Sequence, residues 1–182
     1  MDTKDKSILL ALARDSIEAG FKHQEPNIND SIHLNEDRGV FVTLHKKGVL
    51  RGCIGYPEPV MPLYKAVVNA AKGAAFGDPR FPIVSKDEMR DIKIEISVLS
   101  VPKIIVVSDS DEYPKNIVLG TDGLIIRSDR GFGLLLPQVA TENNMSEVQF
   151  LNALCQKAGL SFNVWKDEDV EILKFQAEIF SE

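Results

Sequence analysis

The sequence predicts an α+β protein with two lobes: a mostly antiparallel sheet packed with helices, a small β-rich lobe, and a cleft between them. Three observations predict this class. Residues 38–55 have the pattern of a β-hairpin, and residues 92–99 alternate apolar and polar side chains as a third strand does. Residues 3–19 carry apolar side chains at helical spacing. At 182 residues the chain is long enough to bury a sizeable core as one domain.

Composition and cysteine spacing narrow the function classes. The 21 Lys and Arg residues against 27 Asp and Glu residues give a formal net charge of −6, which argues against a broad nucleic-acid-binding face. The spacing of Cys53 and Cys155 matches neither a disulfide framework nor a zinc site, and no metal or other cofactor is predicted. No signal-peptide pattern opens the chain, and no apolar run approaches the ~20 residues of a membrane span. We therefore expect a cytoplasmic protein without a membrane contact.

The first helix is predicted over residues 3–19. Asp2 or Thr3 can cap its start, and Gly20 stands where a helix commonly ends. Residues 21–37 are polar and lack periodicity, so we expect a long loop that lies over the site. The loop contains four side chains that could bind a metal, but no two of them have the spacing of metal ligands on a helix or a hairpin: His23, His33, Glu36 and Asp37.

The predicted hairpin separates apolar from chemically active side chains. Lys46-Lys47-Gly48 fits a three-residue turn, which places Thr43 opposite Arg51 and Phe41 opposite Cys53. One face then carries Val40, Val42, Leu44, Leu50 and Ile54. The other carries Thr43, His45, Arg51 and Cys53.

Two glycines in the second hairpin strand indicate a bulge or a close approach of backbone or ligand. Gly52 and Gly55 flank Cys53-Ile54. Backbone N–H groups freed at such a bulge form an anion-binding concavity, with Arg51 beside it. The alternative is a bulged strand in which Cys53 is a small buried hydrophobic residue.

Further along, an Ala-rich helix is predicted over residues 62–75, with Pro62 in its first turn. Asp78-Pro79-Arg80-Phe81-Pro82 follows as a constrained loop, either a platform for function or a turn closed by an Asp78–Arg80 pair. Ser85 and Glu88 form a capping box ahead of the strand at residues 92–99. Glu95 lies in the middle of that strand, and beneath a covered cleft it needs a cationic partner such as Arg51 or Arg80.

The chain is expected to form a single domain over residues 1–182. Its main lobe comprises residues 1–102 and 137–182, and a small β-lobe comprises residues 103–136 with a second hairpin. Pro137 begins a helix on which Gln138 and Glu142 share a face, and a helix follows Ser146 in which Cys155 is a core residue. Residues 170–180 form a last strand.

Four segments resemble the motifs of the AMMECR domain family, named after the Alport syndrome, midface hypoplasia and elliptocytosis chromosomal region. The first is the hexapeptide Leu50-Arg51-Gly52-Cys53-Ile54-Gly55 (LRGCIG), and the second is Asp78-Pro79-Arg80-Phe81. The third and fourth are residues 94–100 and 133–140. They occur in the family's order and cover nearly the whole chain, as in a single-domain member of the archaeal or bacterial type.

The resemblance implies Memo-like and radical SAM proteins as partners and a role in modifying RNA, protein or a small molecule. In an enzyme, Cys53 would be the nucleophile, and Glu95, His23 or His33 its base, since His45 lies about 13 Å away at ~3.3 Å per residue. In a binding module, Arg51, Arg80 and backbone N–H groups would hold a small anionic or RNA-linked ligand without breaking a bond. An accessory subunit is a third possibility, and a homodimer is left open.

The candidate site combines residues from all four motif segments. Cys53 and Glu95 are the candidate catalytic residues. The candidate binding residues are Thr43, Arg51, Gly52, Gly55, Asp78, Arg80 and Gln138.

Overall fold

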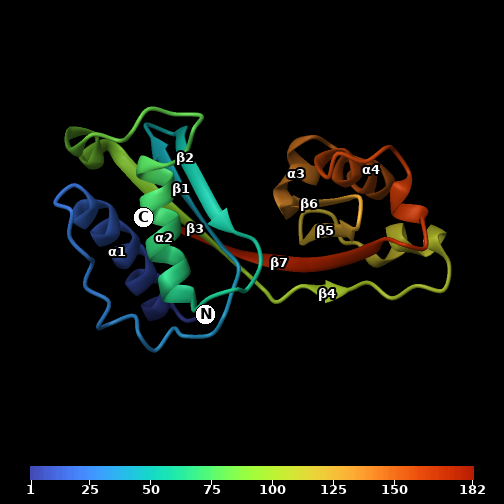
Figure 1. The fold of residues 1–182 in the computed structure, drawn as a ribbon, viewed down its shortest axis with the longest axis horizontal. Coiled ribbons are helices and arrows are strands. Elements are labelled where there is room, and N and C mark those ends of the chain that lie inside the picture. The colour runs from blue at the N-terminus through green and yellow to red at the C-terminus, as the bar shows by residue number, and fades with distance from the viewer. The chain divides into compact units, whose positions relative to one another are not determined.

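The computed structural model describes residues 1–182 and divides them into two compact units. The first comprises Met1–Leu99 and Glu178–Glu182, and the second Ser100–Ala177. Each combines helices with antiparallel strands (Figure 1), so the predicted α+β class is confirmed. None of the helices has both the length and the apolar character that crossing a membrane requires.

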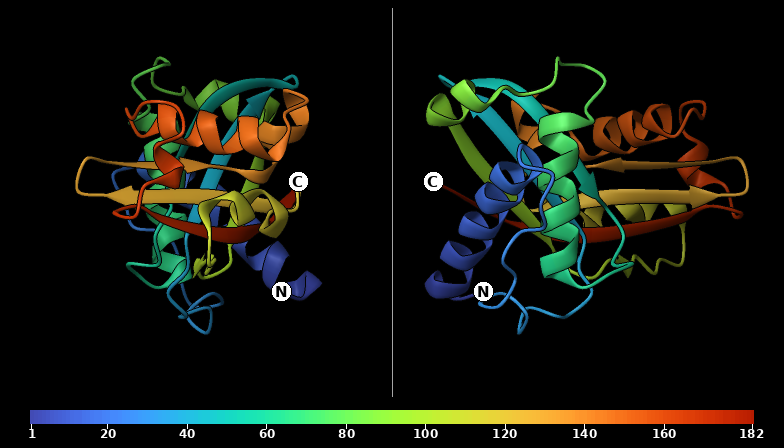
Figure 2. Two further views of the ribbon diagram at one scale, coloured as in Figure 1. Left: turned by 90° about the vertical axis from the view of Figure 1, so that its right-hand side faces the viewer. Right: turned by 60° about the vertical axis from the view of Figure 1, so that its left-hand side comes forward.

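The first unit packs two helices on one face of an antiparallel sheet. Its elements are α1 (Thr3–Gly20), β1 (Val40–Lys46), β2 (Val49–Tyr56), α2 (Leu63–Phe76), a 3₁₀ helix at Lys86–Asp91, and β3 (Ile92–Leu99). The strand order is β2-β1-β3. The chain end that follows β7 (Glu171–Ser181) lies beside β3, where the N–H of Glu182 donates to the Ile94 carbonyl. Figure 2 shows α1 and α2 on the same side of these strands.

The alternating pattern of the strands produces this layering. Val40, Val42 and Leu44 are fully buried, as are Ile94 and Ile96 of β3, and all belong to one hydrophobic core with side chains of α1 and α2. Because side chains alternate along a strand, the residues between them lie on the opposite face. The structure thus confirms that the apolar side chains of β1 are sorted from Thr43 and Cys53.

The hairpin register differs from the expected one by two residues. The turn has two residues, Lys47 and Gly48, both with positive φ, rather than three. A bulge between Leu44 and His45 then leaves Arg51 without a partner in β1, so Thr43 faces Cys53 instead of Arg51. The shorter turn and the bulge each shift the register by one residue. Beyond the bulge the two shifts add up to two residues, so the side chains return to the predicted faces.

Leu50 is the exception to the predicted faces. It pairs with His45 on the face of Thr43 and is 38% exposed, whereas the expected register placed it with the apolar side chains. It lies between the turn and the bulge, where only the first of the two shifts has taken effect.

Helix α2 lies directly on the backbone of β2. A Cβ atom built on Gly52 would lie 2.2 Å from the carbonyl oxygen of Ala74, a distance that no side chain tolerates. The Ala side chains of α2 that face the sheet are buried and short, which permits this approach. The helix thus fixes β2, and Gly52 is required by packing.

The second unit has its own core. It contains β4 (Lys103–Ile104), a 3₁₀ helix at Ser110–Asn116, β5 (Asp122–Ser128), β6 (Gly131–Leu135), α3 (Pro137–Glu142), α4 (Glu147–Lys157), a 3₁₀ turn at Val164–Lys166 and most of β7. Strand β7 pairs with β4 and β5, and β5 pairs with β6. The predicted Pro137 start of α3 and the Ser146 capping box of α4 are both present.

The expected lobe boundary at residue 136 differs from the observed division. Residues 137–177 belong with residues 100–136, because α4 packs on β5 and β6 through Phe150, Leu151 and Leu154. Cys155 is fully buried in that core, as predicted, and burial raises the pKa of its thiol.

We expect Gly52→Ala to lower the free energy of unfolding by about 1–3 kcal/mol, the usual cost of forcing a methyl group into a packed core. Urea unfolding measures this. The control is Gly48→Asn in the turn, where nothing lies within 4 Å of the added Cβ and Asn tolerates the left-handed conformation, so the loss should stay under about 1 kcal/mol. Equal losses for the two variants would contradict the close α2–β2 contact.

Candidate functional site

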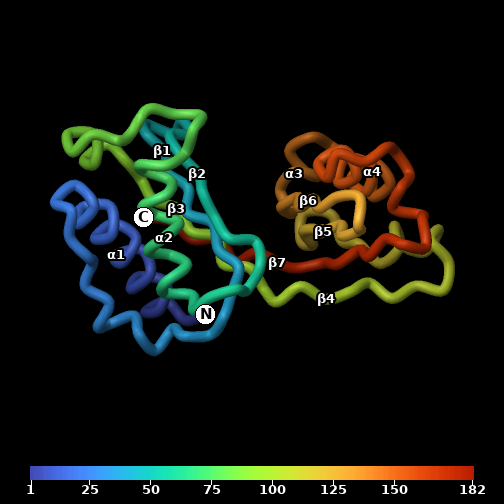
Figure 3. Tube along the Cα trace, viewed as in Figure 1, coloured from blue at the N-terminus to red at the C-terminus, as the bar shows by residue number.

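Three of the predicted site residues form one row across β2, β1 and β3, which run side by side in Figure 3. Thr43 is the direct partner of Cys53 on one side and of Glu95 on the other. The Thr43 hydroxyl lies 3.3 Å from the Cys53 sulfur, within hydrogen-bond range. This polar row of Cys53, Thr43 and Glu95 is half-buried on the sheet face opposite α1 and α2.

The Asp78–Arg80 loop closes the outer edge of β2 at Cys53. The Cys53 N–H donates to Asp78 Oδ2 at 2.9 Å, and Arg80 Nη2 donates to the Cys53 carbonyl at 3.1 Å. Both backbone groups of Cys53 therefore point away from β1, which makes Thr43–Cys53 a non-hydrogen-bonded pair with closely spaced side chains. The loop thus holds the backbone of Cys53 directly.

Asp78 is the centre of this edge contact. Its carboxylate also accepts from Arg80 Nε at 2.9 Å and Nη2 at 2.7 Å, a bidentate pair, and from the Arg80 N–H. The Asp78 side chain is 2% exposed and that of Arg80 is 56% exposed. The Arg80 hydrogen bonds, with help from the Cys53 N–H and against the cost of burial, hold the pKa of Asp78 well below its usual range.

Arg51 is held at a separate ion-pair cluster. The bulge directs it to the Glu88 carboxylate, with both contacts at 3.2 Å, and to the carbonyls of Pro82 and Ile83. Lys46 also binds Glu88, at 2.8 Å. The hydrogen bonds from Arg51 and Lys46 hold the pKa of Glu88 well below its usual range.

The expected pairing of Glu95 with an arginine is wrong. Arg51 binds Glu88 and Arg80 binds Asp78, while the side chain of Glu95 makes no hydrogen bond or ion pair. Glu95 is nevertheless half-buried in the middle of a strand. The structure thus leaves one carboxylate of the polar row without a protein partner.

The anion-binding concavity expected at the glycines is not formed at Cys53. Its N–H, the group best placed to receive an anion, is bound by Asp78. Gly52 is required by the α2 contact, and a Cβ on Gly55 would lie 2.4 Å from both the Phe41 ring and the Val40 carbonyl oxygen. Close packing therefore accounts for both glycines.

Gln138 was predicted for the site and lies in the second unit, whereas Glu88 was not predicted for it and binds Arg51. Gln138 lies on α3 in the second unit, where its Oε1 is buried and makes no hydrogen bond, and its part in the site stays a prediction. Sequence reasoning assigned Glu88 only to a capping box, which it does form. Its second role, the binding of Arg51 and Lys46, had no signal in sequence spacing.

Comparison with known proteins establishes the family. The AMMECR1 family model matches residues 10–180, so the chain belongs to the AMMECR1 family. A protein of Methanothermobacter thermautotrophicus is 52% identical over 149 residues, which cover 82% of this chain and 78% of that one. Protein MK0488 of Methanopyrus kandleri is 46% identical, with 98% and 89% of the two chains covered.

A solved structure supports the same assignment. The chain is similar to the crystal structure of uncharacterized protein PH0010 from Pyrococcus horikoshii, with a TM-score of 0.90 and 42% identity. The match covers 100% of this chain and 93% of that one. The predicted family and fold are thereby confirmed. The names of the family and of this structure describe no reaction.

We expect Asp78→Asn to lower the free energy of unfolding at neutral pH by about 1–3 kcal/mol, because the Cys53 N–H and the Arg80 guanidinium lose a charged acceptor. Since the folded-state pKa of Asp78 is depressed, its contribution is present above the unfolded carboxyl pKa of about 4 and is lost as pH falls through the folded value. Urea unfolding from pH 7 to pH 3 covers the beginning of this loss, so the gap between wild type and variant should start to narrow below about pH 4. A gap between wild type and variant that is unchanged at pH 3 would show that ionisation of Asp78 does not matter.

We expect Arg51→Met and Glu88→Gln to be non-additive in urea unfolding by about 0.5–3 kcal/mol, since their side chains are only 13% and 19% exposed and contact each other. The matched control is Arg51→Met with Glu95→Gln, which should add within about 0.5 kcal/mol. Coupling in the control pair but not in the first pair would contradict the Arg51–Glu88 pair and support an interaction between Arg51 and Glu95.

Proposed function

We propose that the chain is an enzyme, or a subunit of one, that acts on a small substrate at the polar row with Cys53 as nucleophile. The observation that supports this most is the row itself, in which a thiol, a hydroxyl and an unpaired carboxylate share one half-buried sheet face. These groups supply a nucleophile, a hydrogen-bond donor and a proton acceptor.

Two neighbours of Cys53 are placed to interact with its sulfur during a reaction of the thiolate, the reactive form of a cysteine. The Thr43 hydroxyl can donate to the sulfur at 3.3 Å. The Arg80 guanidinium is bound to the Cys53 carbonyl, and its pKa is raised mainly by Asp78 and in part by Cys53. Asp78 thus positions a cation beside the thiol.

Glu95 serves the substrate rather than the thiol. Adjacent antiparallel strands place paired Cα atoms about 4.5–5.5 Å apart, so the Cα atoms of Glu95 and Cys53 are separated by about 10 Å across Thr43. The carboxylate therefore cannot take the thiol proton directly. It is placed to accept a proton or a hydrogen bond from a substrate that lies along the row.

The substrate is proposed to be a small anionic or RNA-linked molecule. Arg80 uses Nε and Nη2 for Asp78 and Cys53, which leaves Nη1 on its exposed side to bind an oxygen of a phosphate or carboxylate. Because Asp78 neutralises Arg80, we expect recognition by hydrogen-bond geometry more than by net charge. Memo-like and radical SAM proteins are the proposed partners.

The alternative is a ligand-binding module without catalysis, working as an accessory to such partners. One observation favours it: the Cys53 N–H, which would stabilise an oxyanion beside the nucleophile, is already bound by Asp78. In this alternative the polar row would bind a ligand through hydrogen bonds, and Cys53 would need no special reactivity.

Labelling with iodoacetamide separates the two. In the native protein at pH 7 we expect Cys53 to be alkylated several-fold faster than glutathione, and Thr43→Val to slow this several-fold because the hydroxyl donor is lost. Glu95→Gln should leave the rate nearly unchanged. Peptide mapping provides an internal control, since the fully buried Cys155 should stay unlabelled. A Cys53 that reacts no faster than glutathione would favour the binding module.

A further inference from the structure

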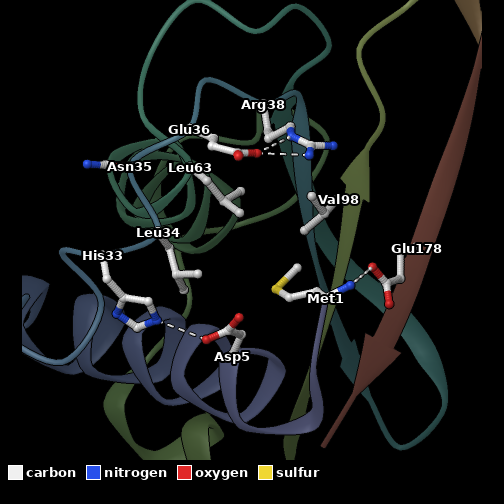
Figure 4. Close-up of a pocket in the computed structure, with 10 residues that line it drawn as sticks. All are labelled: Met1, Asp5, His33, Leu34, Asn35, Glu36, Arg38, Leu63, Val98 and Glu178. Atoms are coloured by element: carbon white, nitrogen blue, oxygen red, sulfur yellow. Dashed lines mark hydrogen bonds and ion pairs between the residues drawn. The ribbon is translucent and has the colours of Figure 1, made fainter.

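A cavity of about 400 Å³ lies in the first unit, away from the polar row. Its walls come from α1, from the loop before β1, from the start of α2, from β3, and from Met1 and Glu178 (Figure 4). Val98 contributes from the same sheet face as the core, whereas the polar row lies on the opposite face. The volume is in the range of small-molecule sites, about 300–1,000 Å³.

The interior of the cavity is apolar and its wall is fixed. Leu34, Leu63 and Val98 point into the same space (Figure 4). The loop that carries Leu34 is bound to the start of α2, because the Leu34 carbonyl accepts from Tyr64 and the Glu36 carbonyl accepts from Leu63. These bonds satisfy N–H groups that a helix start leaves open, so the cavity wall and the helix stabilise each other.

The charged side chains around the cavity are compensated unequally. Glu36 is paired with Arg38, and Glu178 with Lys6 and the amino group of Met1. Asp5 is paired only with His33, at 2.9 Å, which carries a charge only when protonated. The Asp5 side chain is 23% exposed, and its second oxygen has no hydrogen bond. Asp5 is therefore the lining carboxylate without a permanent cation.

We propose that this cavity binds an organic cation, with its ammonium group on Asp5 and its apolar body between Leu34, Leu63 and Val98. Three carboxylates line the cavity, Asp5, Glu36 and Glu178, and the one lining guanidinium is already held by Glu36. An anion would meet these carboxylates without a free cation to offset them. A neutral molecule would fill the apolar space but leave Asp5 without a counter-charge.

The test uses tryptamine as probe, with indole-3-acetate and tryptophol as anionic and neutral molecules of similar shape. Titrations followed by ¹H–¹⁵N NMR at pH 7.5 should show saturable shifts for tryptamine at Asp5, Leu34, Leu63 and Val98. We expect tryptamine to bind at least tenfold more tightly than either analogue.

Variants locate the ligand within the cavity. Asp5→Asn should weaken tryptamine binding about tenfold, and the helix cap should survive because Asp2 binds the Asp5 backbone N–H and not its side chain. Leu34→Ala, at a half-buried loop position, should weaken binding several-fold because it removes apolar contact with the body of the ligand and leaves Asp5 unchanged. Asp30→Asn changes an exposed carboxylate of the same loop outside the cavity and should have no effect. Non-saturable shifts, equal binding of indole-3-acetate, or full binding by both cavity variants would overturn the proposal.

Discussion

The buried carboxylate of Asp78 joins strand β2, at Cys53, to the loop that carries Arg80, and the candidate site depends on this contact. An edge strand leaves every second residue with unpaired backbone groups, and at Cys53 these groups are bound by Asp78 and Arg80. The same contact fixes the position of the Arg80 guanidinium. The Asp78 carboxylate is 2% exposed, and four donors compensate its charge: the backbone N–H groups of Cys53 and Arg80, and Nε and Nη2 of the Arg80 side chain. The site thus rests on a structural ion pair, and the side chains free for chemistry are those of the polar row.

The faces of the hairpin could be predicted from sequence, whereas its register could not. Alternation of Val40, Val42 and Leu44 with Phe41, Thr43 and His45 determines which side chains are buried, whatever the register. Lys-Lys-Gly is compatible with loops of two or three residues, and no residue type identifies the bulge that sets Arg51 aside. The prediction of a Thr43–Arg51 pair failed for this reason, although Thr43 and Cys53 were correctly assigned to one face.

Ion-pair partners and the lobe boundary depended on tertiary information that the sequence does not carry. Glu95, Glu88 and Asp78 were all available to the two arginines, and the partners chosen lie where the backbone already places them: Asp78 two residues from Arg80, and Glu88 beside the bulge. Similarly, the apolar face of α4 predicts that the helix packs on a sheet, but not which of two sheets it contacts. Element positions were accessible from periodicity and caps, and contacts between distant elements were not.

The proposed function of the polar row depends on the unpaired side chain of Glu95. Three other shielded carboxylates of the first unit have cationic partners: Asp78 has Arg80, Glu88 has Arg51 and Lys46, and Glu178 has Lys6. Glu95 is half-buried in mid-strand and has none. The Glu95 oxygens are not among the fully buried polar atoms that lack a partner, so a ligand can reach the carboxylate from solvent. A ligand that donates a hydrogen bond to Glu95 would lie along the row, and because Thr43 stands between Glu95 and Cys53, the ligand would also lie within reach of the thiol.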